Sequence, residues 1–84
     1  MRIPKSRLMS PVEVTWLDHV GHGPAWVSLK DVDHGMATFK SVGYLIDISR
    51  KSITIASTLE PEGDTTGDTT VLVRSCLTDI RYLT

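Results

Sequence analysis

Hydrophobic and polar residues alternate along several short stretches of the chain, which is the pattern of half-buried β-strands. Val12, Val14 and Trp16 occupy every second position of residues 12–18. Two longer stretches rich in β-branched residues, 37–48 and 52–59, flank a short polar turn. Such an arrangement is typical of a β-hairpin. The sequence therefore predicts three strands in the first two thirds of the chain.

Alternate residues of a strand face opposite sides of the sheet, so odd-numbered and even-numbered positions (odd and even parity) face opposite ways. Ile53 and Ile55 are predicted to point inward from the strand 52–59. In the strand 37–48, Phe39 has odd parity, whereas the later apolar positions have even parity: Val42, Tyr44, Ile46 and Ile48. We expect a bend or bulge between Phe39 and Val42, which Gly43 would ease.

The other segments complete a small barrel. Ser28 and Asp31 form an acidic variant of a capping box, which predicts a short helix over residues 29–33 whose Leu29 face covers one end of the barrel. Residues 60–69 are predicted as a flexible acidic loop, followed by strands at 70–74 and 78–83 with a tight turn at 75–77. Residues 1–10 are predicted as a flexible basic tail.

The predicted fold is therefore mainly β: a five-stranded SH3-like or Sm-like barrel with one short helix after the first strand. It forms a single domain over residues 11–84. A barrel this small leaves unpaired strand edges, so we expect a homo-oligomer.

Composition limits the class of protein. The longest apolar runs have three residues, far from the ~20 needed to span a bilayer, and residues 1–10 lack the apolar stretch of a secretory signal. Cys76 is the only cysteine, so no internal disulfide can form. These features predict a cytoplasmic protein with no membrane contact.

The charge distribution argues against a long polyanionic partner. The net charge is −1, from 9 basic and 10 acidic residues. Three of the basic residues, Arg2, Lys5 and Arg7, lie in the first ten positions, which leaves 6 basic and 10 acidic residues, or −4, in the rest. Because binding to long nucleic acids requires Lys and Arg to neutralise several phosphates, we do not expect it here.

No residue pattern indicates catalysis or a cofactor. His19 and His22 form a His-x-x-His motif, but it lies in a Gly/Pro-rich loop without a third spaced ligand, so no metal site is predicted. Cys76 is interpreted as a small buried hydrophobe. The chain is predicted to be a binding protein, with no catalytic residues and no cofactor.

Candidate binding residues lie in several segments. Trp26 follows a Gly/Pro loop and either seals the barrel end or offers a flat face to a base or a partner. Trp16 and Tyr44 are predicted to be core residues. Hydroxyl and guanidinium groups could hold a phosphate. Local hydrogen bonds are the favoured interpretation of Ser57 and Thr58, and solubility and edge protection that of the charged hairpin tip. The predicted ligand-binding set is Trp26, Ser57, Thr58, Arg74, Arg50, Asp18 and His19.

Several motifs, in order, resemble a family of small bacteriophage- and prophage-encoded proteins of unknown function. They are Val12-Glu-Val-Thr-Trp-Leu-Asp18, Trp26, Ser41-Val-Gly-Tyr44, Ile53-Thr-Ile-Ala56 and the final segment 72–83. The resemblance covers nearly everything after residue 11 and implies a phage accessory protein acting in the host cytoplasm. Such proteins frequently block host defence.

The sequence favours one function over two alternatives. The predicted function is a non-enzymatic, oligomeric barrel that binds and sequesters a small nucleotide-like ligand, such as a host-defence signal. The first alternative is an inhibitor or adaptor that binds a host protein through an edge strand or the Trp26 surface. The second alternative is an Sm-like RNA binder, which the charge distribution disfavours.

Overall fold

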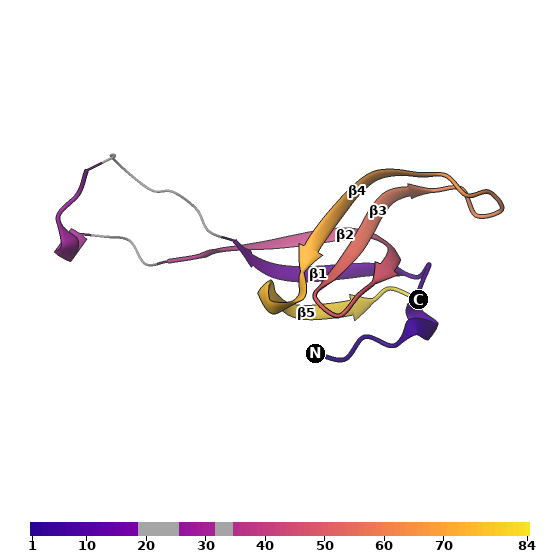
Figure 1. Cartoon of the computed structure of the whole chain (residues 1–84), viewed down its shortest axis with the longest axis horizontal. Helices are drawn as coiled ribbons and strands as arrows, with labels where there is room; N and C mark the ends of the chain where they lie inside the picture. The colour runs from indigo at the N-terminus through magenta and orange to yellow at the C-terminus, as the bar shows by residue number, and fades with distance from the viewer. Residues whose placement is uncertain (19–25, 32–34) are drawn as a thin grey trace.

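The computed structural model of the chain describes residues 1–18, 26–31 and 35–84, and these form one antiparallel sheet with short 3-10 turns (Figure 1). Its strands are β1 (Pro11–Asp18), β2 (Ala37–Ile48), β3 (Ser52–Leu59), β4 (Thr66–Val73) and β5 (Leu77–Tyr82). The order across the sheet is β4-β3-β2-β1-β5. The predicted five-stranded, mainly β fold is confirmed. Since β4 and β5 lie at opposite edges, the described strands form an open, strongly curved sheet.

A single apolar core lies on the inner face of this sheet. Val12, Val14, Leu45 and Ile53 are fully buried, and Ile55 is 4% exposed. Trp16, Ile48, Ile80 and Tyr82 pack around them. The inward orientation predicted for Ile53 and Ile55 is therefore confirmed. No helix in the part of the chain that the structure describes is long and apolar enough to cross a membrane.

The position of the bulge in β2 corrects the prediction. The pairing of β1 with β2 runs without a shift from Pro11–Tyr44 to Asp18–Ala37, so no bulge lies between Phe39 and Val42. The irregularity lies between Leu45 and Asp47. Val42 and Tyr44 consequently face outward and are 60% and 36% exposed. The physical reason is that Val12, Val14 and Trp16 fill the core from β1, which places their partners in β2 on the same inner face.

Residues 1–10 contact the sheet, whereas the sequence predicted a flexible tail. Ile3 is 7% exposed and belongs to the core cluster. The Met9 N–H donates to the Leu45 carbonyl over 2.6 Å, and the Leu45 N–H donates to the Ser10 carbonyl over 2.9 Å. A 3-10 turn, η1 (Lys5–Arg7), lies between Ile3 and Met9. The apolar side chain of Ile3, rather than the charge of its neighbours, decides where this segment lies.

The short helix predicted after the first strand is present in reduced form, but its predicted packing against the barrel is wrong. The structure has a three-residue 3-10 turn, η2 (Leu29–Asp31), and residues 32–34 lie outside the described residues. The capping interaction itself is present, because Ser28 Oγ donates to Asp31 Oδ2 over 3.2 Å. Leu29 is 91% exposed, so this turn does not cover the barrel.

The acidic loop is shorter than predicted, because β4 begins at Thr66 instead of residue 70. Gly67 and Asp68 indicate a loop by composition, but Thr58 and Leu59 of β3 pair with Gly67 and Thr66. The tight turn before the last strand is η3 (Arg74–Cys76). Tertiary pairing here overrides local propensity.

Candidate functional site

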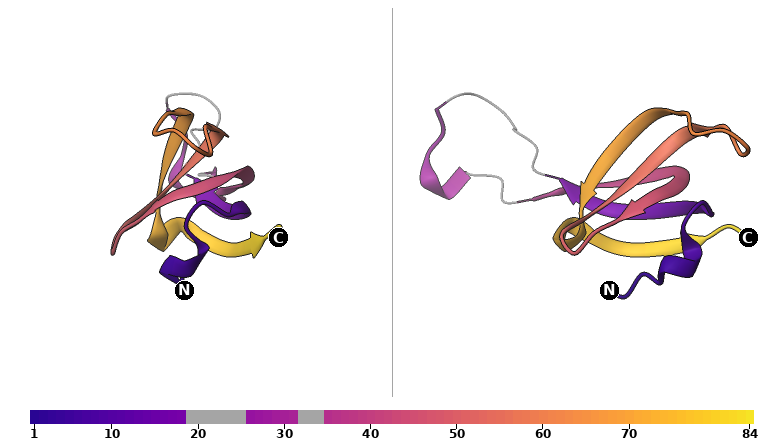
Figure 2. Two further views of the ribbon diagram at one scale, coloured as in Figure 1. Left: turned by 90° about the vertical axis from the view of Figure 1, so that its right-hand side faces the viewer. Right: turned by 45° about the vertical axis from the view of Figure 1, so that its right-hand side comes forward.

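The most unusual feature of the molecule is a two-stranded projection formed by the end of β1 and the start of β2 (Figures 1 and 2). β5 pairs with β1 only as far as Trp16, and β3 pairs with β2 only from Tyr44 onward. Leu17 and Asp18 therefore pair with β2 alone. We call residues 17–18, 26–31 and 35–40 the arm. In Figure 1 the arm extends to the left, away from the curved sheet.

The arm makes the molecule elongated. The chain measures 55 × 25 × 21 Å and has a radius of gyration of 16.1 Å. A compact chain of this length would have a radius of gyration of about 12 Å. The arm therefore holds its side chains away from the core and presents them to solvent.

An aromatic pair marks the base of the arm. Trp16 of β1 and Phe39 of β2 are register partners, and their ring centroids lie 5.1 Å apart. Trp16 Nε1 donates a hydrogen bond to Ser41 Oγ over 2.9 Å, which satisfies the indole N–H and fixes the ring. Phe39 is nevertheless 42% exposed. The inner face of the sheet thus continues out of the core as an apolar surface on the arm.

The exposed apolar side chains of the arm form what we call the arm patch. Trp26 is 92% exposed and Leu29 is 91% exposed, so neither packs against the rest of the chain. The remaining members, Val27, Met36 and Phe39, are 48%, 45% and 42% exposed. Single exposed apolar residues are ordinary, but several large ones on one projection indicate an interaction surface.

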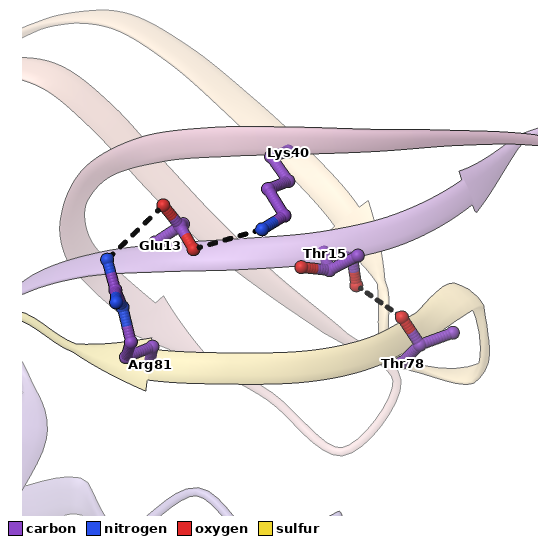
Figure 3. Close-up of polar contacts among 5 residues, drawn as sticks. All are labelled: Glu13, Thr15, Lys40, Thr78 and Arg81. Carbon is purple, nitrogen blue, oxygen red and sulfur yellow. Dashed lines mark hydrogen bonds and ion pairs between the residues drawn. The ribbon is translucent and has the colours of Figure 1, made fainter.

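The face of the sheet on the other side from the core is polar near the base of the arm (Figure 3). Glu13 lies between Lys40 and Arg81, with oxygen–nitrogen distances of 3.8 and 3.6 Å. Thr78 Oγ1 donates to the Thr15 carbonyl over 3.3 Å. Exposed pairs of this kind contribute little stability. They place charged and hydroxyl groups around Val42, the register partner of Glu13, on this part of the outer face.

A second apolar surface lies on the edge strand β4. Val71 and Val73 flank the buried Leu72 and point to the opposite side of the strand, where they are 65% and 54% exposed. They are in register with Thr54 and Ser52 of β3. We call Val71 and Val73 the β4 face. Because alternate residues of a strand point to opposite sides, these valines belong to the outer face of the sheet.

The predicted phosphate-binding residues lie in two groups along β3. Arg74 donates from Nη1 to the Ser49 carbonyl over 2.9 Å and from Nη2 to the Met1 carbonyl over 2.6 Å. Its guanidinium thus joins the hairpin that carries the exposed Arg50 to the start of the chain. Ser57 lies near the other end of β3. It follows Ser52, the first residue of the strand, by five positions, which corresponds to about 17 Å along an extended strand.

Local hydrogen bonds engage Ser57 at its end of β3. Ser57 Oγ lies 3.4 Å from the Gly67 carbonyl and 3.3 Å from Asp68 Oδ2. Thr58 is exposed beside it, opposite Gly67. The φ of Asp68 is 53°, a left-handed conformation that Asp tolerates better than most residues. The Ser57 hydroxyl thus supports the kinked β4 backbone.

The other predicted site residues are not brought to either group. Trp26 is 92% exposed, and Asp18 lies at the end of β1 opposite Ala37 on the arm. His19 lies outside the described residues, as do His22 and His34. Cys76 is partly exposed in η3. The alternative in which Trp26 seals the barrel is wrong, because a sealing side chain would be buried.

No protein-family model, curated protein or solved structure matches the chain. The resemblance to phage-encoded proteins therefore stays a prediction. The candidate site rests on the geometry of the arm and the β4 face.

Proposed function

We propose that the protein is a non-enzymatic interaction module that binds a protein partner through its arm patch. The observation that carries the proposal is the exposure of Trp26 and Leu29, at 92% and 91%. Tryptophan is enriched among the residues that dominate binding energy at protein interfaces, and such residues contribute this energy when a partner buries them. This corresponds to the inhibitor or adaptor alternative for a phage accessory protein.

The shape of the arm supports a macromolecular partner rather than a small ligand. Ligand pockets are concave and enclose most of their ligand. Trp26 and Leu29 instead project from the molecule, where the surface of another protein can cover them. The two Arg74 donors to backbone carbonyls also give that guanidinium a structural role.

The nucleotide hypothesis and the proposed function predict different results in native mass spectrometry. Native mass spectrometry of the protein purified from cells would show whether it retains a protein chain or a small molecule. We expect the wild type to retain a protein chain. The double variant Trp26→Ser/Leu29→Ser should lose it, while a control variant, Leu83→Ser, should keep it. Leu83 is 41% exposed and follows β5, outside the arm.

A small-molecule mass retained by all three proteins would contradict the proposal and favour a nucleotide-like ligand. Retention of the same protein chain by the arm variant would also contradict it, because the arm patch would then contribute nothing to binding. Both variants replace exposed side chains, so the fold should be unaffected, which circular dichroism can verify.

A further inference from the structure

The single chain exposes more surface than its mass requires. Its solvent-accessible area is 6242 Å². A compact folded monomer of 9.3 kDa would expose about 5,000 Å². The excess of about 1,200 Å² exceeds the ~800 Å² that each partner buries in an interface of standard size.

Two separate apolar surfaces contribute to this excess. The arm patch holds Trp26 and Leu29, and the β4 face holds Val71 and Val73, which are 65% and 54% exposed. The arm does not cover the β4 face of its own chain, because Trp26 and Leu29 are more than nine-tenths exposed. Each surface thus lacks a partner within the described part of the chain.

We propose that these two surfaces bind each other between copies of this chain, so that the arm patch of one copy covers the β4 face of the next. The inference rests on the proposed function and names the partner of the arm as a second copy. A single type of contact then buries both surfaces. A two-fold contact of arm with arm would leave Val71 and Val73 in water.

The proposed contact joins two different surfaces, which has a consequence for assembly. Two copies can make it reciprocally, with each arm on the β4 face of the other copy, or the contact can continue from copy to copy into a larger ring or an open chain. The inference therefore predicts a dimer or a larger assembly at high concentration.

Sedimentation analysis of the purified full chain, from about 1 to about 100 µM, tests the inference, because interfaces of standard size span affinities from micromolar downward. The arm variant is Trp26→Ser/Leu29→Ser, and the face variant is Val71→Thr/Val73→Thr. Threonine keeps the shape and strand preference of valine. The matched control is Val42→Thr, which removes a 60% exposed valine from the outer face of β2 that belongs to neither the arm patch nor the β4 face.

We expect the wild type and Val42→Thr to associate alike, and the arm variant to associate at least ~30-fold more weakly, since loss of a dominant interface tryptophan has that effect. The face variant should also associate more weakly than the wild type, because the contact would bury its two hydroxyl groups. The decisive sample is an equimolar mixture of the two double variants. The intact arm of the face variant can still bind the intact face of the arm variant. The mixture should therefore form a 1:1 complex and nothing larger.

Three results would overturn the inference: a monomeric wild type throughout the range, a face variant that associates like the wild type, or a mixture that stays monomeric. A monomeric wild type would leave the proposed function standing, with a different protein as the partner of the arm. In that case native mass spectrometry would still detect a bound chain of a different protein. Failure of the proposed function would instead leave the wild type without any bound protein chain.

Discussion

Replacing Gly43 by alanine should destabilise the fold, although alanine is ordinarily the better strand residue. Gly43 is buried in β2 next to Tyr44, where pairing with β3 begins. A Cβ atom at this position would lie 2.8 Å from the Ala56 carbonyl oxygen and 3.3 Å from Ile55 Cβ. Ordinary contacts of a Cβ atom start near 3.4 Å, so the β3 backbone would have to move.

The magnitude follows from two opposing contributions. Overpacking a core costs about 1–3 kcal/mol. Removing glycine from a strand interior contributes about 0.5–1 kcal/mol in the opposite direction. We expect a net loss of about 1–2 kcal/mol in the free energy of unfolding. For a domain of this size, that loss lowers the midpoint of thermal unfolding by roughly 5–15 °C.

Gly67 offers a matched control on β4. A Cβ atom there would meet only Thr58 Cβ, at 3.6 Å, an ordinary contact. Gly67→Ala should therefore raise stability by about 0.5–1 kcal/mol. Urea denaturation of both variants measures the two effects with opposite signs, provided the slope m stays unchanged. A Gly43→Ala protein as stable as Gly67→Ala would refute the close approach of β2 to the Ala56 carbonyl.

Three further changes test the packing of the chain ends by the same denaturation assay. Ile3→Ala should cost about 2–4 kcal/mol because Ile3 is buried in the core, and a loss below ~0.5 kcal/mol would show that residues 1–10 are a loose tail. Tyr82→Phe should stabilise by about 1 kcal/mol, since the buried Tyr82 hydroxyl has no hydrogen-bond partner among the residues that the structure describes, and a destabilised variant would reveal one. Arg74→Ala should lower the free energy of unfolding by about 1–2 kcal/mol, because its hydrogen bonds to the Met1 and Ser49 carbonyls are lost. Arg74→Lys should not restore both bonds. Full stability of either variant would contradict the structural role of Arg74.

The sequence predicted the elements that local pattern determines. The bounds 37–48 and 52–59 agree with β2 and β3, because β-branched residues and a polar turn specify a hairpin without help from distant contacts. The inward facing predicted for Val42 and Tyr44 is wrong, because it was counted from the apolar residues of β2 alone. The actual face is set by Val12 and Val14 of β1, with which β2 pairs across about thirty residues of sequence.

The candidate site was predictable only in part. Trp26 was singled out from its place after a Gly/Pro loop, and its exposure agrees with a residue that offers its face to a partner. Leu29 was predicted to cover the barrel, because apolar residues near a short helix usually pack inward. How far the arm extends depends on where β3 leaves β2 and β5 leaves β1, at Tyr44 and Trp16. Nothing in the local sequence records those two points.

The ends of the chain meet in the folded protein, which affects how the protein can fold during its synthesis. β5 pairs with β1, the Leu83 N–H donates to the Pro11 carbonyl, and the Arg7 guanidinium lies 4.5 Å from the centre of the Tyr82 ring. During synthesis, β1 emerges from the ribosome long before β5. The hairpin of β2 and β3 can form early, but one edge of β1 stays unpaired until the last strand emerges. Such long-range pairing is slow, so we expect the core to close only after translation of β5.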